Sequence, residues 1–93
     1  MIATEEICML RESAILLHKT MLAYGVDSDN PKVVAARELV GSITRVYDDT
    51  KDESLSPIVI NRCARCARDD FCYLLLNMYE VFNSVIGKRT DYE

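Results

Sequence analysis

Tryptophan is absent from this chain of 93 residues, which contains only one histidine, two prolines and three glycines. The glycines are isolated from one another, so the chain has no glycine-rich loop of the kind that holds nucleotide phosphates. The single histidine, His18, has no serine or cysteine beside it in a recognisable nucleophile motif. We therefore expect no enzymatic activity, no catalytic residues and no bound cofactor.

The chain also lacks a long apolar run, and we expect no leader segment. Its longest uncharged apolar stretch, Phe71 to Tyr79, includes Asn77 and is far shorter than the roughly 20 residues that span a membrane. The N-terminus carries Glu5 and Glu6, whereas a signal peptide begins with basic residues followed by an apolar segment. These absences predict a soluble, cytoplasmic protein that does not bind membranes.

The four cysteines are Cys8, Cys63, Cys66 and Cys72. All four fall in stretches with helical periodicity, and without a secretory signal we expect reduced thiols that are buried as small apolar side chains. A CxxC pair followed by a third cysteine is also typical of zinc sites. On a continuous helix, however, Cys72 points away from Cys63, so one ion cannot bind all three sulfurs. We expect no metal.

Apolar residues recur at steps of three and four along three stretches, which is the period of a helix. Gly25, Asn30 followed by Pro31, and Ser56 followed by Pro57 are typical of helix ends and starts. The sequence predicts helices over residues 5–24, 31–48 and 57–86, with a short tail over residues 88–93. The fold class is therefore all-α, a single domain of residues 1–93 folded as a three-helix bundle.

The third predicted helix is the longest, because no glycine or proline interrupts the sequence from Pro57 to Ile86. If this helix breaks, we expect the break at Arg68–Asp70, where Asp69 or Asp70 could cap a separate helix. Beside its main apolar stripe lies a second apolar face formed by Cys72, Tyr73, Leu76 and Tyr79. Tyrosine is enriched at the centres of interfaces, so we predict a homodimer with Tyr73, Leu76 and Tyr79 at its seam.

The net charge is −4, which disfavours binding to the phosphates of nucleic acids. The polar connection between the second and third helices contains Asp48, Asp49, Asp52 and Glu53, which we expect to contribute to docking on a basic partner. Arg62, Arg65 and Arg68 form a basic stripe on the third helix. We expect these arginines to pair with neighbouring acids, and Arg62 and Arg65 also to contact the partner.

Residues Ile7–Asp48 resemble the helical hairpin of the small sporulation phosphatases that dephosphorylate response regulators. The resemblance consists of an apolar helix, a turn at Gly25, and the run Ala36, Arg37, Glu38, Leu39 and Val40 after Asn30 and Pro31. That family's signature is Ser-Gln-Glu-Leu-Asp, of which Glu38 and Leu39 match, and Val40 stands in place of the final acid. The resemblance implies regulation of a response regulator, but it does not assign the chain to the family.

Together these features predict a small acidic helical module that acts by binding another protein, as adaptors and inhibitors do. Phages and other mobile elements encode proteins of this kind. Two alternatives follow from the other motifs: a metal- or redox-responsive regulator that uses Cys63, Cys66 and Cys72, and a phosphatase-like regulator of a response regulator.

Overall fold

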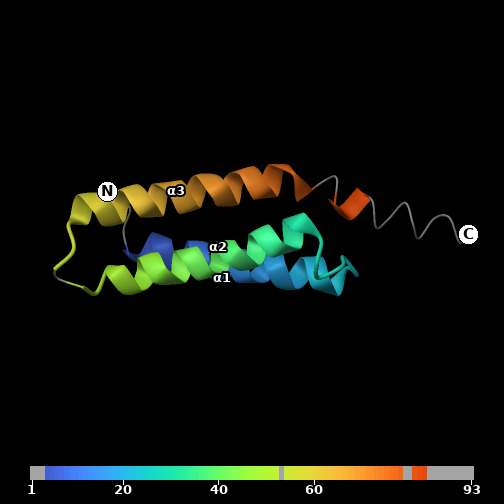
Figure 1. Cartoon of the computed structure of the whole chain (residues 1–93), viewed down its shortest axis with the longest axis horizontal. Helices are drawn as coiled ribbons and strands as arrows, with labels where there is room; N and C mark the ends of the chain where they lie inside the picture. The colour runs from blue at the N-terminus through green and yellow to red at the C-terminus, as the bar shows by residue number, and fades with distance from the viewer. Residues whose placement is uncertain (1–3, 53, 79–80, 84–93) are drawn as a thin grey trace, which may run out of the picture.

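The computed structural model describes residues 4–52, 54–78 and 81–83. Over these residues the chain forms three helices and no strand: α1 (Thr4–Ala23), α2 (Pro31–Asp49) and α3 (Pro57–Leu76). The predicted three-helix bundle is confirmed. Figure 1 shows that α1 and α3 run in the same direction and that α2 runs antiparallel to both. Helix α2 packs extensively on both neighbours, whereas α1 and α3 make few close approaches to each other.

Helix α1 ends in a Schellman motif at Gly25, as predicted from the glycine. Gly25 has φ of +88°, its N–H donates to the carbonyl of Leu22 at 3.0 Å, and the N–H of Val26 donates to that of Met21 at 3.1 Å. Met21 and Val26 are both buried, which supplies the apolar contact that accompanies this motif. The turn therefore directs the chain back along α1.

Helices α2 and α3 both begin with a capping residue followed by proline, as the sequence predicts. The Asn30 side chain accepts a hydrogen bond from the N–H of Lys32 at 2.9 Å, and the Ser56 hydroxyl accepts one from the N–H of Ile58 at 3.3 Å. Each cap satisfies a backbone donor that has no partner within its helix.

Helix α3 continues through Arg68–Asp70, the place where the sequence predicts any break, and it ends instead at Leu76. The N–H of Asn77 reaches the carbonyls of Tyr73 and Leu74 at 3.3 and 3.1 Å, and its side-chain amide donates to the carbonyl of Tyr73 at 2.8 Å. Asparagine ends the helix here because its side chain competes for backbone partners. Met78 and residues 81–83 are helical again, and the predicted end at residue 86 lies outside the described residues.

The core is built around α2, in which Val33, Ala36 and Ile43 are completely buried. Leu39 and Val46 are also buried, whereas Val40 and Tyr47, which steps of three and four from Val33 place on the predicted apolar stripe, are only partly so. The stripe is rotated because α2 packs against two helices rather than one. At one end of the bundle the ring of Phe82 packs edge-on against that of Tyr24, with centroids 5.1 Å apart.

None of the helices in the described part of the chain has the length and apolar character needed to cross a membrane.

Replacing each of the two glycines in the described residues with alanine should change the stability, with opposite sign at the two positions. Gly25→Ala should lower the free energy of unfolding by about 1 kcal/mol, because alanine resists the left-handed conformation. Gly41→Ala, in the exposed middle of α2 where nothing lies within 4 Å of an added Cβ, should raise it by up to about 1 kcal/mol. Urea unfolding followed by circular dichroism measures both changes. Destabilisation by both substitutions would contradict the helical geometry at Gly41.

Candidate protein-binding surfaces

The last turn of α3 exposes a run of apolar side chains, which we call the terminal patch: Cys72, Tyr73, Leu75 and Leu76. Tyr73 is 67% exposed and Leu76 is 82% exposed, and in this run only Leu74 is buried. The exposure arises because α3 packs on the bundle through a single side, leaving its outer surface without a neighbouring helix. Of the three residues predicted at a dimer seam, Tyr73 and Leu76 are thus exposed on the same turn, and Tyr79 lies outside the described residues.

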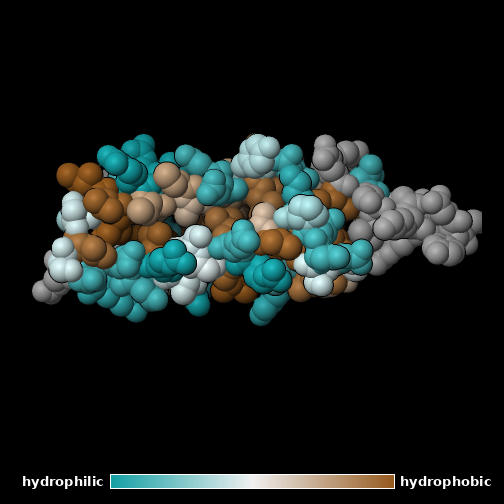
Figure 2. Space-filling view, viewed as in Figure 1, coloured by the Kyte–Doolittle hydropathy of each residue, from teal (hydrophilic) through white to brown (hydrophobic). Residues whose placement is uncertain are grey.

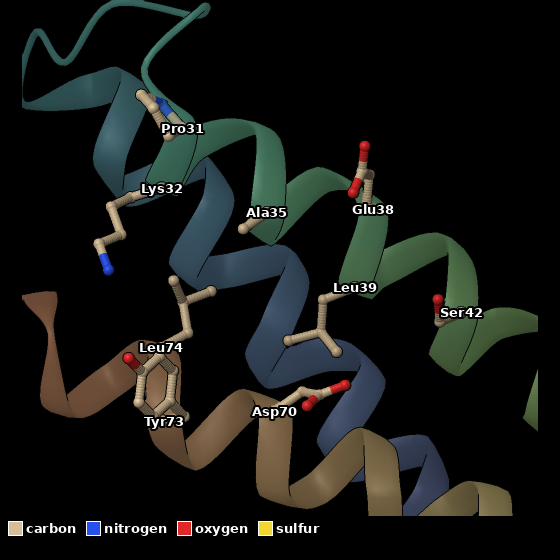
Figure 3. Close-up of a pocket in the computed structure, with 9 residues that line it drawn as sticks. All are labelled: Pro31, Lys32, Ala35, Glu38, Leu39, Ser42, Asp70, Tyr73 and Leu74. Carbon is tan, nitrogen blue, oxygen red and sulfur yellow. The ribbon is translucent and has the colours of Figure 1, made fainter.

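A groove runs between α2 and α3, with a volume of about 420 Å³. Figure 2 shows apolar residues as an interrupted band between hydrophilic residues along this face of the bundle. Its lining residues, shown in Figure 3, are Pro31, Lys32, Ala35, Glu38, Leu39, Ser42, Asp70, Tyr73 and Leu74. Leu39 and Leu74 are buried and form the apolar floor. The groove adjoins the terminal patch, because Tyr73 belongs to both.

Among the charged side chains of this α2–α3 groove, the lysine contacts an aromatic ring, whereas the two carboxylates form no salt bridge within the described residues. Lys32 points across the groove toward Tyr73 (Figure 3), and its Nζ lies 5.8 Å from the centroid of the ring, within the range of a cation–π contact. The Asp70 carboxylate projects from α3 toward Leu39, while Glu38 stands on the rim with its carboxylate turned away from α3. The only ion pair among the described residues is Arg68 with Asp69, so neither groove carboxylate is neutralised by a salt bridge there.

A second, smaller groove lies where α1 and α3 separate, with a volume of about 260 Å³ and a lining of Glu6, Met9, Leu10, Ser13 and Arg68. Met9 is 67% exposed, and Leu16, seven residues further along the same side of α1, is 66% exposed. Neither residue is among the predicted binding residues. Their seven-residue spacing, outside the main apolar stripe, is the sequence feature that indicates a second exposed face on α1.

The predicted acidic docking segment lies at the opposite end of the bundle from the terminal patch. Asp48 is exposed and Asp49 is half-buried at the end of α2, Asp52 is exposed in the connection, and Glu53 lies outside the described residues. Arg62 and Arg65 are exposed on α3. Within the described residues neither arginine pairs with this segment, and the stripe's one ion pair joins Arg68 to Asp69 at 3.9 Å.

Asp52 organises the connection between α2 and α3. Its Oδ1 accepts hydrogen bonds from the Ser54 hydroxyl at 2.7 Å and from the Ser54 N–H at 2.9 Å. These two bonds, of which the bond from the Ser54 hydroxyl has the larger effect, hold the pKa of the Asp52 carboxyl below its ordinary value because they favour the charged form. The hydrogen bonds therefore stabilise the turn fully when the pH is above the ordinary pKa of an aspartate. This stabilisation is lost as the pH falls through the lowered pKa of Asp52.

The expectation that the cysteines are buried is wrong for three of the four. Cys63, Cys66 and Cys72 are exposed, and Cys8 is half-buried. Positions 63 and 66 lie beside the main stripe of α3, which is formed at its centre by Ala64 and Ala67. Among the described residues, no group of three or more histidine, cysteine or acidic side chains is placed to hold a metal ion.

Comparison with known proteins does not extend these observations, since no family model matches the chain and neither a curated protein nor a solved structure matches it.

The hydrogen bonds of Asp52 predict a pKa change on removal of the Ser54 hydroxyl. Ser54→Ala should raise the pKa of Asp52 toward its ordinary value, because it removes the hydroxyl hydrogen bond, which has the larger effect on that pKa. Ser54→Thr, which keeps a hydroxyl, should leave the pKa low. An NMR titration of the Asp52 side-chain carbonyl measures both. Equal titration curves for wild type and Ser54→Ala would show that the turn does not form in solution.

The exposures of the cysteines predict their reactivity. Under native conditions Cys63, Cys66 and Cys72 should react quickly with a thiol reagent, and Cys8 should react more slowly because α1 packing partly covers it. Intact mass under native conditions should show the chain without bound metal, because α3 holds Cys63 and Cys72 on different sides. About one zinc per chain, lost on Cys66→Ser, would contradict the continuous helix.

Proposed function

We propose that this chain is a protein-interaction module, an adaptor or inhibitor that acts by binding another protein through the terminal patch of α3. The observation that carries the proposal is the pair of large, strongly exposed side chains Tyr73 and Leu76 on one turn. Clustered exposed apolar surface on a small domain commonly marks an interaction site, and tyrosine is among the residues that contribute most at interfaces.

The simplest partner for this patch is a second copy of the chain, related by a two-fold axis. Burying a large apolar side chain contributes about 1.5–3 kcal/mol, whereas association costs roughly 4–15 kcal/mol. Tyr73 and Leu76 from both copies therefore support only a weak dimer by themselves. A homodimer at micromolar concentration needs the adjoining Leu75 and Cys72 in the contact as well.

Light scattering tests the proposed dimer. Wild type at high micromolar concentration should have twice the monomer mass of 10.6 kDa, and Leu76→Ser should shift it to monomer without loss of helicity. Ile58→Ser is the matched control, because Ile58 is 70% exposed at the other end of the same helix and should leave the dimer intact. A wild-type monomer would exclude self-association, and equal effects of the two variants would show that the patch is not the seam.

The acidic segment formed by Asp48, Asp49, Asp52 and Glu53 belongs to the same proposal, as a surface that attracts a basic partner. Exposed acids of this kind act mainly on the association rate, and their effect weakens with salt. Arg62 and Arg65 are proposed as further partner contacts, since they are exposed and close to the beginning of α3.

One observation favours a second candidate, the redox-responsive regulator. Cys63 and Cys66 are both exposed and lie about one turn apart on α3, so an oxidant can reach both thiols. On this reading, oxidation of the Cys63 and Cys66 thiols to a disulfide changes how α3 binds its partner. Loss of the dimer after treatment with hydrogen peroxide, prevented by replacing Cys63 and Cys66 with serine, would distinguish this candidate from simple constitutive binding.

A further inference from the structure

We propose that the α2–α3 groove receives an amphipathic helix from another protein, and that this helix presents an arginine or lysine beside a large apolar side chain. The inference rests on the proposed function as a protein-interaction module and specifies the chemistry of a partner. It concerns a surface that meets the terminal patch only at Tyr73.

The groove has the length and the lining expected for a helix. On α2 the lining residues repeat every three or four positions from Pro31 to Ser42, which corresponds to about 16 Å, or three turns. Ala35 and Ser42 have small side chains, so a docked helix can approach α2 closely. Helices bind in grooves of this kind through apolar residues spaced one turn apart.

The floor supplies apolar contact in the middle of the groove. Leu39 of α2 and Leu74 of α3 are buried beneath it, and the Tyr73 ring flanks them (Figure 3). A leucine or similar side chain entering between the helices covers these three residues. This accounts for the apolar half of the expected partner.

The carboxylates decide the charge of the partner. Asp70 projects into the groove, Glu38 stands on its rim, and the one cation in the lining, Lys32, is held over Tyr73. A docked helix would remove water from Asp70, and a carboxylate that loses water without gaining a partner destabilises the complex. An arginine or lysine of the partner compensates for the lost hydration of Asp70 through a charge-assisted hydrogen bond, and arginine can do so with two donors.

Two synthetic peptides test the inference. The first is a 16-residue amphipathic helix with leucines on one face flanked by arginines, and the second carries glutamine in place of every arginine. Fluorescence anisotropy should show that the arginine peptide binds wild type more tightly than the glutamine peptide by at least tenfold at physiological salt. In NMR spectra, the amide shifts it causes should centre on Ala35, Ser42 and Asp70.

Asp70→Asn and Asp69→Asn form a matched pair of variants. Both remove one negative charge from neighbouring positions, but only Asp70 lines the groove, whereas Asp69 pairs with Arg68. Asp70→Asn should weaken binding of the arginine peptide about tenfold, the size expected for one charge-assisted hydrogen bond. Asp69→Asn should change it less than twofold. Ala35→Trp, which fills the groove, should abolish binding.

Three results would overturn the inference: no binding of the arginine peptide, equal binding of both peptides, or equal effects of Asp70→Asn and Asp69→Asn. Leu76→Ser separates this outcome from the proposed dimer. That variant should lose self-association while it still binds the arginine peptide. A protein that dimerises but fails the peptide tests would therefore contradict the groove inference alone, and a monomer that passes them would contradict the dimer alone.

Discussion

The packing of α2 between its two neighbours is the interaction on which the rest of the structure depends. Val33, Ala36 and Ile43 are completely buried, and removal of such apolar surface from water is the main stabilising contribution in a domain of this size. Because α2 contacts α1 on one side and α3 on the other, each outer helix is held mainly by α2. The bundle consequently resembles two helical hairpins that share their middle helix.

This arrangement explains why so much apolar surface stays exposed. In a closed bundle each helix is covered by two neighbours, but here α1 and α3 make few close approaches to each other. Met9 and Leu16 remain exposed on α1, and Tyr73 and Leu76 on α3. The exposed side chains therefore reflect the position of α3 on α2, and they form surfaces available to a partner.

The α2–α3 groove combines these apolar positions with charge. Its floor is part of the core, so the position of the floor is set by folding, while Asp70 and Glu38 are surface side chains that folding leaves without an ion-pair partner in the described residues. An apolar floor alone would accept many helices. The carboxylates narrow the choice toward a basic helix, because specificity is a difference between affinities and an unpaired charge weakens the wrong complexes.

The sequence by itself determined the helices and most of their ends. The steps of three and four, Gly25, and the cap-proline pairs at Asn30 and Ser56 are local signals, since each depends on hydrogen bonds and backbone angles within a few residues. The second apolar face of α3, which carries Tyr73 and Leu76, also followed from helical spacing. The end of α3 at Asn77 was missed because asparagine is tolerated within many helices and interrupts only some of them.

Tertiary structure alone decided which neighbour covers each face. Three features depend on how α3 is rotated and placed on α2. Leu39 is buried more completely than Val40, Cys63 and Cys66 are exposed, and Asp70 meets the α2 side of the groove. Residues 39 and 70 are separated by a long stretch of chain, and periodicity says nothing about contacts between helices. The groove is therefore a property of the packed bundle, because its two walls exist as one surface only after α3 has docked on α2.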